Sequence, residues 1–177
     1  SHDDGLAYVG PGIRATYGWR VERAAKATPQ QVADRHFVKD VAARTLPMLR
    51  DAGVTILTGT DAGFLNSFNY PGFSLHDELE LYVKLGLTPR DALMGSVVDG
   101  PRFLNQGERY GAVAAGKSAD LLVLDADPLA DVSATRRIAD VVLRGRLIEA
   151  SELERMRGEI RARVVARNAS FTPSPAS

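Results

Sequence analysis

The sequence predicts an α/β fold, and two observations carry that prediction. Residues 28–53 have the apolar spacing of an amphipathic helix, and the short apolar run VTILTG follows at residues 54–59. A run of this kind, rich in β-branched residues, is typical of a strand buried on both faces. Further along, residues 109–150 contain β-like segments separated by glycine and Asp-Pro turns. Helix, turn and buried strand in this order indicate a parallel α/β layer.

The first helix has recognisable start and stop signals. Thr28 is the expected N-cap, with proline at the next position and Gln31 three residues after the cap, which is the spacing of a capping box. Pro47 is expected to kink or divide the helix, because proline removes a backbone donor and crowds the preceding turn. Gly53 is expected to end it.

Two shorter helices are predicted after residue 73. The first runs from Ser74, which can cap it with Asp77 three residues on, to Gly86. The second starts at Thr88 with the same cap chemistry and runs to about Phe103. The expected inner face of the first consists of Leu75, Leu79, Tyr82 and Val83.

The two ends of the chain are less regular. Residues 1–27 are expected to be a loop or a strand remnant, with helical character only from Trp19 onward. A strand pair or a bent strand is expected around Gly145, and a last helix should be capped by Ser151 with Glu154 as its box partner. The tail NASFTPSPAS is expected to be disordered.

Composition limits the classes of partner. The 177 residues hold 22 basic and 22 acidic side chains, so no net field favours nucleic acid or an anionic membrane. Without cysteine the chain has no disulfides, zinc fingers or thiol chemistry. No apolar run reaches the roughly 18 residues of a membrane span, and the start lacks a signal-peptide pattern. We therefore expect a cytoplasmic protein, while a longer precursor could carry a signal.

Three stretches between Leu46 and Ile148 resemble one known family. They are LRDAGVTILTGTDAG, LHDELELYVKLGLTPRDAL and GAVAAGKSADLLVLDADPLAD, the last followed by IADVVLRGRLI. In this order and spacing they resemble the carboxy-terminal portion of the amidohydrolase superfamily, in its imidazolonepropionase and prolidase-like branch. The resemblance implies a C-terminal fragment of a (β/α)₈ TIM barrel in residues 1–108 and part of a small β-sandwich in residues 109–150. Residues 151–177 would form a terminal helix and tail.

Asp61 is the expected catalytic and metal-binding residue. It follows the predicted strand of residues 54–59, and sites of α/β barrels lie at the carboxyl ends of the strands. The resemblance implies that it binds a divalent metal, zinc being expected, and takes a proton from the metal-bound water. A carboxylate suits both roles. The alternative is that Asp61 caps the following turn together with Thr60.

The remaining metal ligands of that family are missing from the sequence. The family uses a His-x-His pair and further histidines, whereas the three histidines here are His2, His36 and His76, and none forms such a pair. A complete barrel takes roughly 200 to 250 residues before any sandwich is added. The expected partner is therefore the missing amino-terminal barrel portion or another copy of the chain. His36 is expected to be a solvated helix residue, and His2 to lie at a frayed terminus.

Four residues around the following loop are expected to contact substrate: Phe64, Asn66, Tyr70 and His76. Loops over strand ends often carry specificity. The alternatives are a self-packed surface loop and, for His76, an exposed position in a first helical turn. Gly116 and Lys117 lack the frame of a phosphate loop and are expected to form a turn. Turn roles are also expected for Asp120, Asp125 and Asp127.

The sequence and the resemblance together indicate two alternative functions of different classes. The first is a metal-dependent hydrolase acting on an amide or peptide-like C–N bond, with a small-molecule amide or dipeptide-like substrate. The second is a non-catalytic fragment or interaction module that lacks the metal-binding histidines and needs a partner chain. The number of metal ligands in the chain separates the two.

Overall fold

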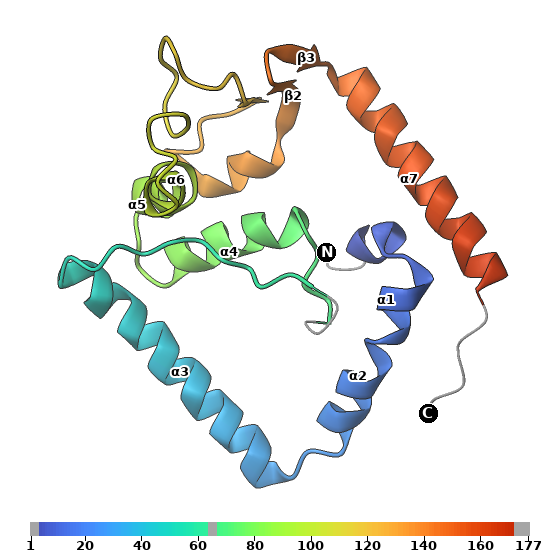
Figure 1. Cartoon of the computed structure of the whole chain (residues 1–177). Helices are drawn as coiled ribbons and strands as arrows, with labels where there is room; N and C mark the ends of the chain where they lie inside the picture. The colour runs from blue at the N-terminus through green and yellow to red at the C-terminus, as the bar shows by residue number, and fades with distance from the viewer. Residues whose placement is uncertain (1–3, 64–66, 172–177) are drawn as a thin grey trace.

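A computed structural model describes residues 4–63 and 67–171, and its elements confirm the α/β class (Figure 1). In chain order they are the 3₁₀ turn η1 (Asp4–Tyr8), α1 (Pro11–Ala15), α2 (Gly18–Ala25), α3 (Pro29–Asp51), α4 (Phe73–Lys84), α5 (Pro89–Met94), the π-helix η2 (Gly95–Asp99), α6 (Gly100–Phe103), β1 (Leu121–Leu124), the 3₁₀ turn η3 (Val132–Arg136), β2 (Ile138–Leu143), β3 (Arg146–Ile148) and α7 (Ala150–Ser170). The sheet is antiparallel, so the expected parallel layer is not found in the described residues.

The described residues from Asp4 to Ala25 are mostly helical, which corrects the expectation of a loop or strand remnant before Trp19 and confirms the helical character from Trp19 onward. A 3₁₀ turn and two short helices carry the chain from Asp4 to Ala25. Val9, which follows η1, and Tyr17, between α1 and α2, are buried together with Tyr70 from the loop before α4. This contact, which joins residues far apart in the chain, explains why the local sequence was a poor guide to this segment.

Helix α3 begins as the sequence predicts. The Thr28 hydroxyl accepts the Gln31 backbone N–H at 3.2 Å, and the Gln31 side chain accepts the Thr28 N–H at 3.0 Å. Pro47 lies inside the helix, which continues to Asp51, so the expectation that Pro47 divides it is wrong. One missing backbone bond is tolerated in a helix of 23 residues. Gly53 follows with a φ of 77°, in the left-handed region used to end helices.

Residues 54–60 are not a strand, although their sequence predicts one. A strand needs a neighbour to which its backbone groups bond. Here two side chains of α4, Tyr82 and Glu78, form hydrogen bonds with the Leu57 carbonyl and the Gly59 amide instead. Val54 is 49% exposed, and no residue of the segment is fully buried. The apolar run therefore belongs to an extended segment that lies against α4 and is not part of a sheet in this structure.

Helix α4 starts two residues earlier than predicted. Its N-cap is Gly72, at a φ of 82°, and Ser74 lies in the first turn, where its hydroxyl accepts the Tyr70 N–H at 2.8 Å. The expected Ser74 cap is thus wrong, because Ser74 is used by the preceding loop. Gly86, at a φ of 105°, follows the helix end as predicted. Leu79 packs with Ala92 of α5 and with Val132 of η3, and Leu93, Tyr82 and Val83 border that cluster.

The second predicted helix is found, and it contains a π-helical turn. Thr88 and Asp91 form the expected capping box, and the helical path runs through α5, η2 and α6 to Phe103. π-helical turns are rare and often lie at functional sites. Gly95, the first residue of the turn, is packed against the backbone of Ile56.

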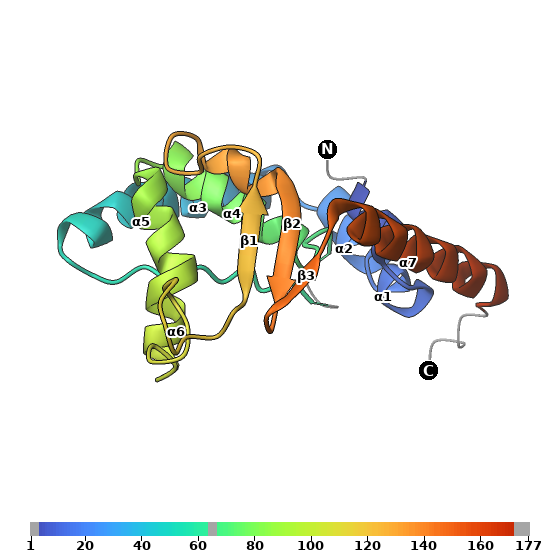
Figure 2. The ribbon, with the colours of Figure 1, turned by 90° about the horizontal axis from the view of Figure 1, so that it is seen from above.

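The β segments form one small sheet in the order β1-β2-β3, seen from above in Figure 2. Leu122 pairs with Val141, which in turn pairs with Ile148. Arg144 and Gly145 join β2 to β3 with φ values of 52° and 82°, as a two-residue hairpin turn requires. The strand pair predicted around Gly145 is therefore confirmed. Residues 110–120, expected to be extended, form turns and coil, including the predicted turn at Gly116 and Lys117.

Helix α7 leaves the sheet and lies on the opposite side of the molecule from α3 (Figure 1). Its N-cap is Glu149 and not Ser151, which corrects the prediction. The Asp140 carboxylate on β2 accepts the first helical N–H, that of Ala150, at 3.1 Å. It therefore satisfies a backbone donor that an N-cap side chain would otherwise satisfy. The helix continues to Ser170, so the start of the expected disordered tail is helical. Among the described residues, no helix is long and apolar enough to cross a membrane.

Candidate active site

Asp61 lies at the end of the extended segment of residues 54–60, and it is exposed. Its φ of 51° is in the left-handed region, which aspartate and asparagine enter more readily than most residues. The Thr60 hydroxyl accepts the Ala62 N–H at 3.3 Å, so Thr60 contributes to the turn that the sequence allowed as an alternative. The side-chain amide of Asn69 donates to the Thr60 carbonyl. These bonds fix the backbone on both sides of Asp61.

Two side chains of α4 hold the segment that leads to Asp61. Both carboxylate oxygens of Glu78 accept the Gly59 N–H, at 2.9 Å and 3.1 Å. The Tyr82 hydroxyl is 2.9 Å from the Leu57 carbonyl oxygen and 2.7 Å from Glu78 Oε1, and it shares its one proton between them. Burial raises the pKa of the Tyr82 phenol, and the hydrogen bond to Glu78 raises it further. Tyr82 therefore stays a neutral donor at physiological pH.

Sequence reasoning missed this pair. The sequence places Tyr82 on the apolar inner face of its predicted helix and indicates no role for Glu78. Their spacing of four residues puts them on one face of α4, which the sequence alone shows. What the sequence does not show is that residues 57–59 cross that face.

A cavity of about 340 Å³ lies beside this segment. Its walls come from Gly59 and Thr60, from the loop before α4, and from one side of α4. Asp77 and Glu78 face it, and Asp61 directly follows Thr60 of its wall in the sequence. An opening of this size next to an exposed carboxylate can admit a small molecule.

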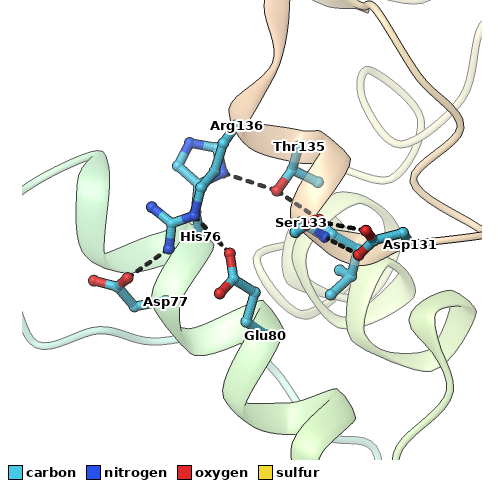
Figure 3. A network of polar contacts seen from close by, with 8 residues as sticks. His76, Asp77, Glu80, Asp131, Ser133, Thr135 and Arg136 are labelled. Carbon is cyan, nitrogen blue, oxygen red and sulfur yellow. Dashed lines mark hydrogen bonds and ion pairs between the residues drawn. The ribbon is translucent and has the colours of Figure 1, made fainter. Parts of the chain in front are cut away.

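His76 lies on another face of α4 (Figure 3). Its Nδ1 is 3.0 Å from the Thr135 hydroxyl, which itself donates to the Val132 carbonyl at 2.9 Å. Because that hydroxyl has one proton, His76 Nδ1 is the donor of the first bond, and Nε2 carries the lone pair. His76 borders a separate cavity of about 550 Å³, together with residues of η1, β2 and α7. The structure thus does not bring His76 into the cavity beside Thr60.

The charge state of His76 follows from its surroundings. Burial lowers the pKa of His76, and the nearby Arg136 guanidinium lowers it further, while Asp77 and Glu80 oppose these effects. Arg136 is itself paired with both acids, which ties η3 to α4. His76 is therefore neutral at pH 7, and its observed contacts are those of a residue that joins two elements.

The other predicted substrate contacts are distributed as follows. Tyr70 is 4% exposed and packs with Val9 and Tyr17. A Cβ at Gly5 would overlap its ring, so a glycine is needed there. Phe64 and Asn66 lie outside the described residues.

The two histidines that were set aside can also be placed. His36 is exposed on α3, as expected of a solvated helix residue. His2 lies outside the part of the chain that the structure describes.

The donor set does not fit a complete metal centre. Within residues 4–63 and 67–171, no group of three His, Cys, Asp or Glu side chains could hold a metal ion. Zinc sites use three or four protein ligands. Asp61 is therefore not part of such a group among the residues that the structure describes.

Comparison with known proteins adds the family. The model of the Amidohydrolase family matches residues 20–148, which is most of the chain and includes Asp61, Glu78 and Tyr82. The chain belongs to this family. An imidazolonepropionase from Chromobacterium violaceum is 35% identical over 91 residues, which cover 51% of this chain and 21% of that protein. The amidohydrolase chain thus spans about a fifth of this relative's length.

Solved structures agree with the fold. A bottromycin amidohydrolase superposes with a TM-score of 0.73 at 20% identity, covering 94% of this chain and 36% of that one. A prolidase solved with N-methylphosphonate-L-proline superposes with a TM-score of 0.56 at 26% identity, covering 70% of this chain and 30% of that one. The arrangement described here therefore occurs within larger hydrolases.

Proposed function

We propose that this chain supplies one part of a metal-dependent amidohydrolase that cleaves an amide or peptide-like C–N bond. The observation that carries the proposal is the anchored segment of residues 57–61, which ends in an exposed carboxylate inside the stretch that matches the family. A carboxylate in this place can bind a cation or accept a proton. In the proposal Asp61 takes both roles.

The remaining donors come from polypeptide outside this sequence. One carboxylate does not hold a divalent cation, zinc in our proposal, and the described residues contain no ligand cluster. Residues 1–108 would form part of a TIM barrel, residues 109–150 part of a sandwich, and residues 151–177 a terminal helix and tail. We call this chain together with the polypeptide that supplies the other donors the complete protein.

Helix α3 supports the need for such a partner. None of its residues is buried within the described structure. Phe37, Val38 and Met48 are between 64% and 68% exposed. Burying an apolar side chain of this kind is worth about 1.5 to 3 kcal/mol. The remaining barrel polypeptide, or a second copy of the chain, would cover this helix in the complete protein.

The proposed substrate is a small amide or a dipeptide-like molecule. The prolidase relative was solved with a proline derivative, which fits this class. Phe64 and Asn66 lie in the sequence between Thr60 and Phe68, which both line the cavity, and they remain candidate substrate contacts. Tyr70 and His76 also stay predictions, and the observed packing of both would have to change for them to reach that cavity.

A non-catalytic interaction module is the second candidate. The missing ligand cluster favours it for the chain by itself. It would keep the helices and the sheet and use the exposed face of α3 for binding. It predicts that no preparation containing this chain hydrolyses an amide.

Hydrolysis assays separate the two candidates. The complete protein and this chain alone are each supplied with zinc and incubated with an Xaa-Pro dipeptide or an N-acyl amino acid. We expect the complete protein to release free amine, measured by chromatography, while the chain alone stays at the background rate. Hydrolysis by the chain alone would contradict the proposed origin of the missing ligands. A complete protein inactive on every amide tested would support the interaction module.

A further inference from the structure

We propose that Glu78 and Tyr82 are positioning residues that set the direction in which residues 57–59 deliver the Asp61 carboxylate. They act through backbone groups and do not touch the carboxylate in the hydrogen bonds that define the pair. The inference rests on the proposed role of Asp61. It adds that this role depends on Glu78 and Tyr82, because they set the direction of the backbone that carries Asp61.

The two contacts lie on one edge of the extended segment. Along an extended chain, backbone groups two residues apart point to the same side. The Leu57 carbonyl and the Gly59 amide are therefore the pair of groups to which a neighbouring strand would bond. The Tyr82 hydroxyl binds the first of these groups, at 2.9 Å, and the Glu78 carboxylate binds the second, at 2.9 Å. Two side chains of one helix thus replace a strand.

The pair is also joined internally. Glu78 Oε1 accepts from the Tyr82 hydroxyl at 2.7 Å while it accepts from Gly59, so the three bonds share one carboxylate. Bonds to an ionised acceptor are about twice as strong as neutral ones. Both side chains are partly buried, which limits competition from water. This edge of the segment is therefore held at two points two residues apart.

A third contact limits movement in another direction. Gly95 of η2 faces Ile56, and a Cβ built on Gly95 would lie 2.5 Å from the Ile56 carbonyl oxygen. The segment before Asp61 is thus bonded to α4 at residues 57 and 59 and closely packed against η2 at residue 56. With only Thr60 between Gly59 and Asp61, little freedom remains for the backbone from which the carboxylate projects.

The test compares two variants of one helix in the isolated chain. Glu78→Gln removes the charge and one of the two acceptor oxygens, whereas Glu80→Gln makes the same change two residues on, where the carboxylate pairs with Arg136. Amide hydrogen exchange and ¹⁵N relaxation are measured by NMR. In Glu78→Gln we expect the Gly59 amide to exchange about ten-fold faster or more. We expect the order parameter of Asp61 to fall from about 0.85 toward 0.6. In Glu80→Gln both values should stay near those of the unaltered chain.

Tyr82→Phe provides a second variant if Glu78→Gln fails to fold. It removes the bond to Leu57 and keeps the Glu78 carboxylate, so we expect the order parameter of Asp61 to fall while Gly59 stays partly protected. In the complete protein, Glu78→Gln should lower kcat with little change in KM, because a misdirected carboxylate affects chemistry and not binding.

Equal exchange and equal order parameters in Glu78→Gln and the unaltered chain would overturn the inference. The NMR measurements need no substrate, so their failure rejects the positioning pair and leaves the proposed function standing. Conversely, an inactive complete protein rejects the proposed function while the NMR result still stands.

Discussion

Asp61→Asn is expected to lower the rate of amide hydrolysis by the complete protein about 10²- to 10⁴-fold, the range seen when a general acid or base is lost. The substitution removes the negative charge and the proton acceptor but keeps the size of the side chain. Asparagine tolerates the left-handed backbone at this position, where φ is 51°. The loss should therefore appear in kcat, measured by amine release at saturating zinc.

Asp125→Asn is the matched control. Asp125 is another exposed aspartate, next to the end of β1 and outside the cavity beside Thr60. The same change of charge there should leave the rate within about two-fold, as expected for a surface substitution. If Asp61→Asn matched this control in kcat, Asp61 would have no part in the chemistry.

Gly95→Ala is expected to destabilise the chain by about 1 to 3 kcal/mol, the usual cost of overpacking. The new methyl group would lie 2.5 Å from the Ile56 carbonyl oxygen, which is backbone and cannot turn aside as a side chain can. For a chain of this size each kcal/mol lowers the melting temperature by roughly 2 to 4 °C. Thermal unfolding followed by circular dichroism measures the shift.

Gly158→Ala provides the control with the opposite sign. Gly158 lies within α7, and a Cβ built there meets nothing within 4 Å. Alanine should therefore stabilise this helix by about 0.5 to 1 kcal/mol, since glycine loses more backbone freedom on folding. A Gly95→Ala chain as stable as the unaltered one would mean that η2 does not press on residue 56 in solution.

Features set by neighbouring residues were predictable from the sequence. The capping boxes at Thr28 and Thr88 need only residues three positions apart, and both form as predicted. The hairpin turn at Gly145 likewise follows from the conformation that glycine permits. The α/β class is confirmed by the strands within residues 109–150, whereas the buried strand expected at residues 54–59 is not found.

Features that depend on distant residues were predicted poorly. Ser151 gives way as the cap of α7 to Asp140, which reaches the start of that helix from β2. The run at residues 54–59 has the composition of a strand, but Glu78 and Tyr82 occupy the groups that a neighbouring strand would need. In each case a tertiary contact overrides the local preference.

The candidate site likewise contains residues that the sequence could identify and residues that it could not. Asp61 could be named from a motif, because its chemistry follows from residue type and position in the family pattern. The roles of Glu78, Tyr82 and Gly95 depend on which helix face lies under the segment, which the sequence does not show. His76 was expected near Asp61 but bonds to Thr135, which lies 59 positions further along the chain.

Zinc content tests the central claim most directly, which is that this chain contributes Asp61 and that the other ligands come from outside it. The isolated chain, its Asp61→Asn variant and the complete protein are equilibrated with the same buffered zinc and measured by elemental analysis. We predict stoichiometric zinc in the complete protein, less when it carries Asp61→Asn, and none retained by the isolated chain. Near-stoichiometric zinc on the isolated chain that is lost in Asp61→Asn would contradict the account.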